Sequence, residues 1–212
     1  MRMIFLTALI ILTGAVLFPD PSACEEFPRW SVGLKGGQNE MQTENWDATY
    51  TDTMSFGGIE IGRKFFRQFG VVLGVSSTHS EAQAKTKTGR TSNDKVDTRL
   101  VPIDLSCVYR LDLVDDQIVV PYIAAGITHT FYQIQLNDDE RSGDQTGYHV
   151  KGGIQLLLDR FDPSAAVDVE ENWGLKNTYL FLEYYYSQVD DFGSESNDLG
   201  SKGIALGVIF EF

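Results

Sequence analysis

The chain is poor in cysteine and histidine and, beyond its first segment, has no long apolar run. Its only cysteines among 212 residues are Cys24 and Cys107, so a disulfide framework is not expected. The three histidines do not form a metal-spaced cluster with cysteine, and no cofactor is expected. No apolar run after residue 24 approaches the ~18 residues that a membrane-spanning helix needs. A spanning helix in the mature chain is therefore excluded.

Basic residues are also scarce. The chain has 17 Lys and Arg against 30 Asp and Glu, which gives a formal net charge of −13. A nucleic-acid partner is not expected, because such partners need a basic surface. The sequence also lacks a phosphate-cradling glycine loop and the nucleophile elbow of hydrolases. The sequence thus contains no motif that indicates one of the common classes of soluble enzyme.

Residues 1–24 are predicted to be a cleaved secretory signal peptide. Arg2 provides a positive start, residues 3–18 are almost wholly apolar, and two prolines then end the run. Cleavage after Cys24 by signal peptidase I is expected, and cleavage just before Cys24, as in a lipoprotein, is the alternative. Residues 25–212 would form the single mature domain.

Alternation of apolar and polar residues with a period of two is the main signal in the mature chain. In the last segment, the even positions from Ile204 to Phe212 are apolar, and small residues and Glu211 occupy most of the odd positions. Eight such segments are predicted as strands: Trp30–Gln38, Met54–Lys64, Phe69–Ser80, Val96–Leu111, Val119–Leu136, Tyr148–Asp159, Asn177–Val189 and Gly203–Phe212.

Two folds fit this alternation. In a soluble β-sandwich the apolar stripe would form the core, whereas in a membrane barrel it would face lipid. The secretion signal and the terminal Phe212 favour the barrel. We therefore expect an all-β fold, an eight-stranded antiparallel up-and-down transmembrane β-barrel. Aromatic residues near strand ends are interpreted as interfacial girdles: Trp30, Phe65, Phe69, Tyr122, Phe131, Tyr132, Tyr148, Tyr179 and Tyr186.

The links between the predicted strands alternate in length. Four long links are predicted to be extracellular: 39–53, 81–95, 137–146 and 190–200. Two short links, 63–68 and 112–118, are predicted to be periplasmic turns. Link 160–176 is a long exception, and its start at Asp162-Pro163-Ser164 and its Gly174 predict a short helix. We expect this helix to lie under the barrel on the periplasmic side.

Several segments carry a family resemblance. They are the terminal GIALGVIFEF, the opening SVGLKGG, the pair LVPIDLSCVYRL and VVPYIAAGITHTFY, and NTYLFLEYYY. The chain resembles the small eight-stranded outer-membrane β-barrel proteins of Gram-negative bacteria, of the porin-like and OmpA/OmpX-like type. The resemblance implies a location in the cell outer membrane, among outer-membrane lipid and lipopolysaccharide. It also implies that the barrel-assembly machinery reads Phe210 and Phe212 as a signal.

Charged residues opposite the apolar stripes are predicted to face the lumen. They are Lys35, Glu60, Asp104, Arg110, Lys151, Asp159, Glu183 and Glu211. An eight-stranded barrel is only wide enough for its side chains to fill, so these shielded charges should pair. We expect a static plug of ion pairs. The alternative is a narrow, gated channel for small solutes in which the pairs exchange partners.

The histidines raise a third alternative, a lipid A-modifying enzyme. His79 beside Ser80, and His129 between two threonines, are predicted near the strand ends. Some eight-stranded barrels are lipid A deacylases or acyltransferases, which need a nucleophile, a base and an acid within hydrogen-bond reach. Here the two histidines lie on different strands and no acid can be matched to them. His149 is predicted to face the interior, and no catalytic residue is assigned.

The predicted extracellular loops differ in charge. The acidic run Asp138-Asp139-Glu140 is a candidate calcium site, because hard cations prefer clustered oxygen ligands, and a solvated loop is the alternative. Basic residues in the second loop are predicted to contact lipopolysaccharide phosphates: Lys85, Lys87, Arg90 and Lys95. The function predicted overall is a non-enzymatic structural or surface-interaction role, with no ligand identified.

Overall fold

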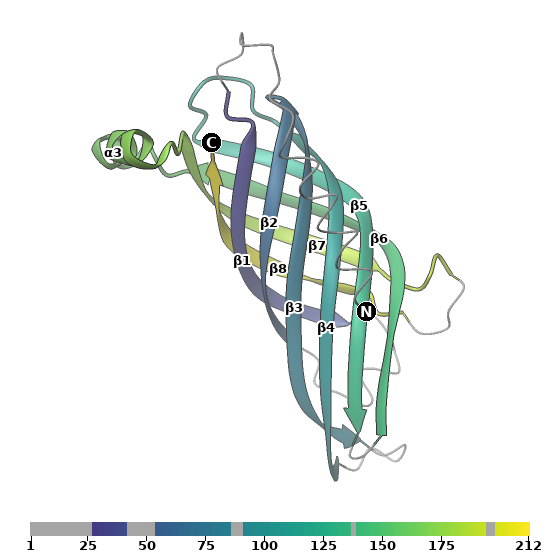
Figure 1. Cartoon of the computed structure of the whole chain (residues 1–212). Coiled ribbons are helices and arrows are strands. Elements are labelled where there is room, and N and C mark those ends of the chain that lie inside the picture. Colours follow the sequence, from purple (N-terminus) through teal and green to yellow (C-terminus); the bar gives the residue numbers. More distant parts are fainter. Residues whose placement is uncertain (1–26, 42–53, 86–90, 137–138, 194–197) are drawn as a thin grey trace.

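The chain folds into a closed antiparallel barrel of eight strands (Figure 1). The computed structural model describes residues 27–41, 54–85, 91–136, 139–193 and 198–212. The elements are β1 Trp30–Met41, β2 Met54–Phe66, β3 Phe69–Lys85, β4 Thr91–Arg110, β5 Val119–Leu136, β6 Asp139–Leu157, α3 Pro163–Trp173, β7 Asn177–Gln188 and β8 Ser201–Glu211. The predicted up-and-down barrel with one short helix is confirmed. The predicted signal peptide lies outside the described residues.

Pairing between the first and last strands closes the barrel. β1 and β8 run antiparallel in a register that places Ser31 opposite Glu211. Beyond the last strand residue, the Phe212 amide donates to the Trp30 carbonyl at 2.9 Å. The Phe212 carbonyl accepts from the Arg29 amide at 3.0 Å. The sheet therefore has no free edge along this seam, as a membrane-spanning sheet requires.

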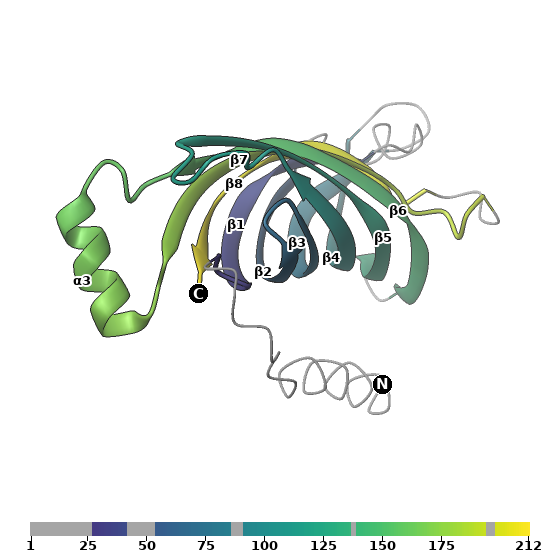
Figure 2. The ribbon, with the colours of Figure 1, turned by 90° about the horizontal axis from the view of Figure 1, so that it is seen from above.

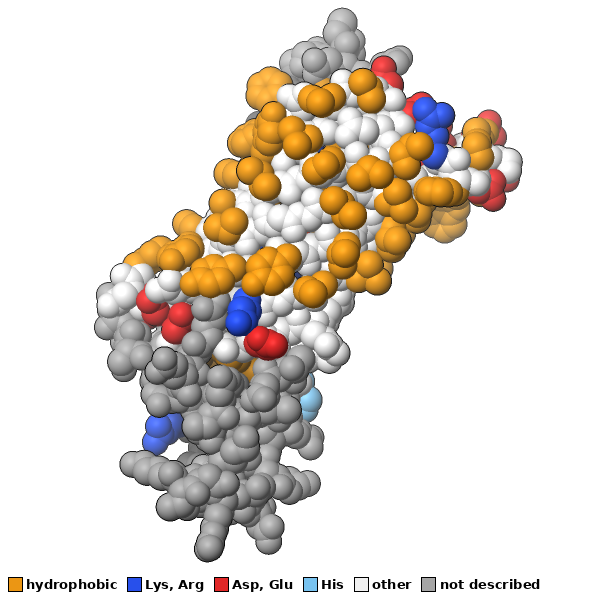
Figure 3. All heavy atoms as spheres, turned by 180° about the vertical axis from the view of Figure 1, so that it is seen from behind, with side chains coloured by type: hydrophobic (Ala, Val, Ile, Leu, Met, Phe, Trp, Pro, Cys, Tyr) orange, Lys and Arg blue, Asp and Glu red, His pale blue; other side chains and the backbone are white. Residues whose placement is uncertain are grey.

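The outward face of the wall is apolar. Ile123 is 63% exposed and Leu206 is 54% exposed. Each of the eight strands has at least one exposed aliphatic side chain of this kind on its outward face. Figure 3 shows hydrophobic side chains spread over one side of the barrel wall. Such a surface is far larger than the apolar patches of soluble monomers and matches a lipid environment. In the described part of the chain, no helix is long and apolar enough to cross a membrane.

Three of the predicted girdle aromatics are placed differently. Tyr122 and Tyr179 are buried in the lumen, and Tyr132 packs against a buried cluster inside the barrel. The girdle prediction is wrong for these three. All lie on the strand face opposite the apolar stripe, and a narrow barrel needs bulky side chains there to fill it. Phe65 and Phe69 are exposed on the outside, as expected of interfacial aromatics.

Half of the strands are much longer than the others. β3, β4, β5 and β6 have 17, 20, 18 and 19 residues, whereas β1, β2, β7 and β8 have 12, 13, 12 and 11. Figure 1 shows β3–β6 extending farther than the rest at the end away from the C-terminus. The predicted loops 81–95 and 137–146 are thus largely strand, since β3 runs to Lys85, β4 starts at Thr91 and β6 starts at Asp139. Backbone pairing thus continues beyond the predicted strand ends, where apolar alternation no longer marks the strand.

Helix α3 starts and ends at the predicted residues. The Asp162 carboxylate caps it by accepting from the Ala165 amide at 3.1 Å and from the Ser164 hydroxyl at 2.7 Å. Gly174 adopts the left-handed conformation, with φ of 69°, and its amide donates to the Glu170 carbonyl at 2.9 Å. Short-range capping chemistry therefore fixes both ends of the helix.

The position of α3 differs from the prediction. Figures 1 and 2 both show it to the side of the barrel wall instead of across the opening. None of its residues is buried. The expectation that it lies under the barrel is wrong. Charged side chains of the barrel occupy that end of the lumen and do not form an apolar surface against which the helix could pack.

Candidate functional site

A buried ion cluster occupies the end of the lumen near the C-terminus, the end that the sequence predicts to be periplasmic. It consists of Lys64 on β2, Arg110 on β4 and Glu211 on β8, and we call it the periplasmic ion cluster. Arg110 donates to one oxygen of Glu211, and the Lys64 ammonium donates to the other at 2.9 Å. Asn177 adds a third donor at 3.0 Å, and Glu211 is only 1% exposed. These charge-assisted hydrogen bonds hold together strands from three parts of the barrel.

A layer of apolar and aromatic side chains packs next to this cluster. It is formed by Val120, Leu157, Tyr179, Phe181 and Ile209, all buried. The Arg110 guanidinium lies 4.9 Å from the centroid of the Tyr179 ring and joins the two layers. Gly207 makes room for the Phe181 ring, because a Cβ there would lie 2.5 Å from a ring carbon and 2.3 Å from a backbone oxygen.

Paired charges fill the middle of the lumen. Lys151 donates to Asp104 at 2.9 Å, and Lys35 lies 3.3 Å from Glu60. The Tyr122 hydroxyl donates to Glu183 at 2.8 Å. The ionic groups named so far comprise four cations and four carboxylates: Lys35, Lys64, Arg110 and Lys151 against Glu60, Asp104, Glu183 and Glu211. Charge balance and pairing are the conditions for burying such groups.

The structure brings most of the predicted lumen charges together. Asp159 is the exception: it lies beyond the end of β6, where its carboxylate accepts from the Thr178 amide at 3.2 Å. Partial burial raises the pKa of this carboxyl. Lys64 is the residue that the sequence reasoning missed. It shares a strand face with Gly58, Glu60 and Gly62, so continuing the alternation by two residues would have found it.

A chain of hydrogen bonds joins three neighbouring strands next to these pairs. The Ser106 hydroxyl lies 2.7 Å from Nε2 of His149, and the Thr128 hydroxyl lies 2.7 Å from Nδ1 of the same ring. Thr128 also donates to Asp104 at 2.8 Å, and Lys151 donates to the other oxygen of Asp104. This chain links β4, β5 and β6.

The direction of the chain follows from its donors. The single hydroxyl proton of Thr128 goes to Asp104, because a carboxylate can only accept. Nδ1 of His149 must therefore carry the hydrogen that Thr128 accepts. In the neutral ring Nε2 is then the acceptor, and Ser106 donates to it. His149, for which the sequence predicted only an inward-facing position, thus organises this part of the lumen.

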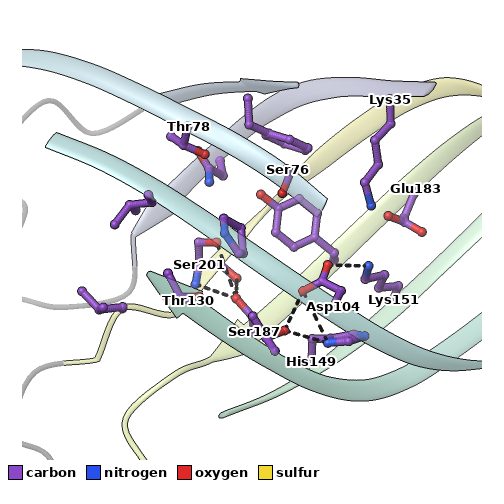
Figure 4. Close-up of a pocket in the computed structure, with 17 residues that line it drawn as sticks. Lys35, Ser76, Thr78, Asp104, Thr130, His149, Lys151, Glu183, Ser187 and Ser201 are labelled. Carbon is purple, nitrogen blue, oxygen red and sulfur yellow. Dashed lines mark hydrogen bonds and ion pairs between the residues drawn. The ribbon is translucent and has the colours of Figure 1, made fainter. Parts of the chain in front are cut away.

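A cavity of about 50 Å³ lies beside these charges, on the side away from the periplasmic ion cluster (Figure 4). Lys35, Lys151 and Glu183 line one part of it, and hydroxyl side chains such as Thr78 and Ser201 line another. This volume is enough for a few water molecules and too small for a lipid or a sugar.

The two histidines considered for catalysis lie on different strands, His79 on β3 and His129 on β5. The His129 ring lies 3.6 Å from Asp144 and 2.9 Å from Thr146, and it is partly exposed. His79 is exposed on β3, across from Arg99 on β4, and the Ser80 side chain lies outside the described ones.

Ser106 and His149 have the residue types of a nucleophile and its base. However, they are 2% and 1% exposed, and Ser106 does not line the cavity. A reacting substrate needs space within about 3 Å of the nucleophile. The geometry therefore suits a structural chain better than a catalytic one.

The candidate calcium site cannot be placed. Asp138 lies outside the described residues, and Asp139 and Glu140 belong to β6 with side chains outside the described ones. In the part of the chain that the structure describes, no group of three or more His, Cys, Asp or Glu could hold a metal ion. The side chains of the basic residues predicted to meet lipopolysaccharide also lie outside the described ones: Lys85, Lys87, Arg90 and Lys95.

Known structures share the barrel fold at low sequence identity. Neisserial surface protein A superimposes with a TM-score of 0.60 and 14% identity, over 86% of this chain and 97% of that one. Ail, the attachment invasion locus protein of Yersinia pestis, gives 0.54 and 14%, over 88% and 99%. The outer membrane protein OprG of Pseudomonas aeruginosa gives 0.53 and 12%, over 88% and 97%. No curated protein matches the chain in sequence.

A family model decides the assignment. The model of the outer membrane protein β-barrel domain matches residues 8–212, almost the whole chain. The closed eight-stranded topology and the apolar outer wall agree with it. The chain therefore belongs to the outer membrane protein β-barrel family.

Proposed function

We propose that this protein is a non-conducting, non-enzymatic outer-membrane barrel that presents a surface for interaction at its extracellular end. The observation that carries the proposal is the burial of Glu211 between Arg110 and Lys64, next to a fully packed apolar layer. Breaking such a buried pair costs about 3–5 kcal/mol, which disfavours an open path through the lumen. The chain's ion pairs then act as a plug.

Single-channel recording in planar bilayers tests the closed lumen. The wild-type protein is expected to add no discrete conductance steps. A variant with Tyr179→Ala and Phe181→Ala, which removes two rings from the apolar layer, is expected to conduct. Leu182→Ala is the matched control, since it lies on the same strand and faces outward. A folded barrel in each case is verified by a different gel migration before and after boiling.

The second candidate is a narrow channel. It is favoured by the two cationic partners of Glu211, between which the carboxylate could alternate. Discrete conductance from the wild-type protein would support the channel and overturn the plug. The third candidate, lipid A modification, predicts a changed lipid A mass spectrum in cells lacking the gene, and we expect no change.

The long strands support the surface role. β3–β6 carry the sheet past the point where the described pairing of β3 with β2 ends, at Thr78. Ail, a similar barrel, has been solved with the heparin analogue sucrose octasulfate. A polysulfated ligand is disfavoured for this chain by its net charge of −13. A hairpin-trimmed variant without residues 82–94, compared with the full protein for adhesion of expressing cells, tests this role: equal adhesion would contradict it.

Export and assembly complete the proposal. Residues 1–24 would direct export, and the barrel-assembly machinery would read Phe210 and Phe212. Phe212 is 43% exposed at the end of the wall, so it is accessible for recognition. Phe212→Ala is expected to lower the amount of folded barrel in the outer membrane of cells, with refolding of the purified protein in detergent unaffected.

A further inference from the structure

Helix α3 leaves an apolar surface without a protein partner. None of its residues is buried, and Trp173 at its end is 77% exposed. Phe161, just before the helix, is 68% exposed, and Val167 is 53% exposed. Side chains of this size are seldom left in water without a reason, and here they gather on one short segment.

The apolar residues of α3 lie mainly along one side. Ala165, Val169 and Trp173 recur at intervals of four residues, which places them in one stripe of an α-helix. Asp168 and Glu171 fall on the opposite side of the helix, which also carries Val167. The helix is therefore amphipathic, with an acidic face and a narrow apolar face.

The location of α3 brings this stripe to the edge of the lipid-facing wall. Trp173 precedes Asn177, the first residue of β7, by only four residues, so it stays within ~14 Å of the barrel rim. The same rim exposes apolar residues of the short turns, including Phe66 and Leu113. Figures 1 and 2 show α3 projecting sideways from this end of the wall. A lipid headgroup layer ~5–8 Å thick borders the hydrocarbon at this level.

We propose that α3 is an interfacial helix that lies in the periplasmic leaflet of the outer membrane, with Trp173 as its lipid anchor. The occupant of the apolar stripe is a zwitterionic phospholipid surface, continuous with the lipid that already surrounds the barrel. An acidic helix of 11 residues would bind such a surface weakly alone. Attachment to β6 and β7 at its two ends holds the helix at high effective concentration beside the leaflet. Its weak intrinsic affinity for lipid is then sufficient for binding.

Tryptophan fluorescence in brominated phosphatidylcholine vesicles tests the proposal. A variant with Trp30→Phe and Trp46→Phe retains Trp173 alone, and a variant with Trp46→Phe and Trp173→Phe retains Trp30 at the barrel wall. Lipids brominated near the headgroup are expected to quench Trp173 more strongly than lipids brominated near the chain ends. Acrylamide in the water is expected to quench it weakly. Strong acrylamide quenching without lipid quenching would overturn the proposal.

Charge placed on the stripe provides the matched comparison. In the Trp173-only background, Ala165→Glu with Val169→Glu is expected to abolish quenching by lipid, while Ser164→Glu with Val167→Glu on the opposite side of the helix leaves it unchanged. Gel migration before and after boiling confirms that each barrel is folded. A second copy of the chain as occupant would instead make Trp173 protection rise with the protein-to-lipid ratio, and that result would also overturn the proposal.

Discussion

The two ends of the lumen are filled in different ways. At the periplasmic end, one carboxylate, Glu211, balances two cations next to an apolar layer. Toward the extracellular end, hydroxyls and His149 form a hydrogen-bonded chain beside a cavity of about 50 Å³. A buried charge that loses its counter-charge has no other group to pair with. A hydroxyl beside a cavity that loses its partner can form a hydrogen bond with a water molecule instead. The periplasmic end should therefore be the less tolerant of substitution.

The largest effect is expected from Glu211→Gln. This change keeps the side-chain shape but leaves Arg110 and Lys64 buried without their counter-charge. We expect the free energy of unfolding to fall by about 3–5 kcal/mol. Urea unfolding of the barrel in phospholipid vesicles, followed by tryptophan fluorescence, measures it.

A triple variant separates charge from packing at the same place. Lys64→Met, Arg110→Met and Glu211→Leu together remove every charge of the periplasmic ion cluster. Stability is expected to return to near the wild-type value, because replacing a whole buried ion group by apolar residues is often neutral. If Glu211→Gln cost no more than a surface substitution, the contrast between the two ends would be lost.

A smaller effect is expected from Thr128→Val at the other end. The change leaves Nδ1 of His149 without an acceptor and removes one donor to Asp104. An unsatisfied buried group costs about 1–3 kcal/mol, and the nearby cavity should keep the loss toward the lower value. The control is Thr98→Val, since the Thr98 hydroxyl is buried without a hydrogen-bond partner in the described structure. Equal effects of the two substitutions in urea unfolding would contradict the proposed chain.

The smallest effect is expected at α3, outside the lumen. The Ser164 hydroxyl and the Ala165 amide hold the pKa of Asp162 below its usual range. Because the folded pKa lies below the unfolded one, the cap is fully formed above the unfolded pKa and is lost as pH falls through the folded pKa. Asp162→Ala should abolish this acid transition of α3 and leave barrel unfolding unchanged. The emission of Trp173 in the single-tryptophan background, recorded against pH, would reveal it; an identical transition in the variant would exclude Asp162 as its cause.

The sequence predicted the number and position of the strands far better than their lengths. Alternation located every strand, because a residue that faces lipid must be apolar and its neighbour faces the lumen. It failed at the ends of β3, β4 and β6, which extend into the predicted loops without a regular alternation of apolar and polar residues. The sequence also predicted Tyr122 and Tyr179 to lie on the outside of the barrel, whereas they are buried in the lumen. An aromatic residue near a strand end can lie either in an interfacial girdle or inside the barrel, and its position in the sequence does not distinguish the two.

What the sequence by itself determined is the face of each residue and the caps of α3. Both depend on neighbours within a few positions, through the two-residue period of a strand and the hydrogen bonds of a helix end. Which lumen residues meet was decided only by tertiary structure: Glu211 binds Lys64 and Arg110 across 147 and 101 residues of sequence. The stagger of the strands around the closed barrel sets the height of each side chain, and no local pattern encodes that stagger.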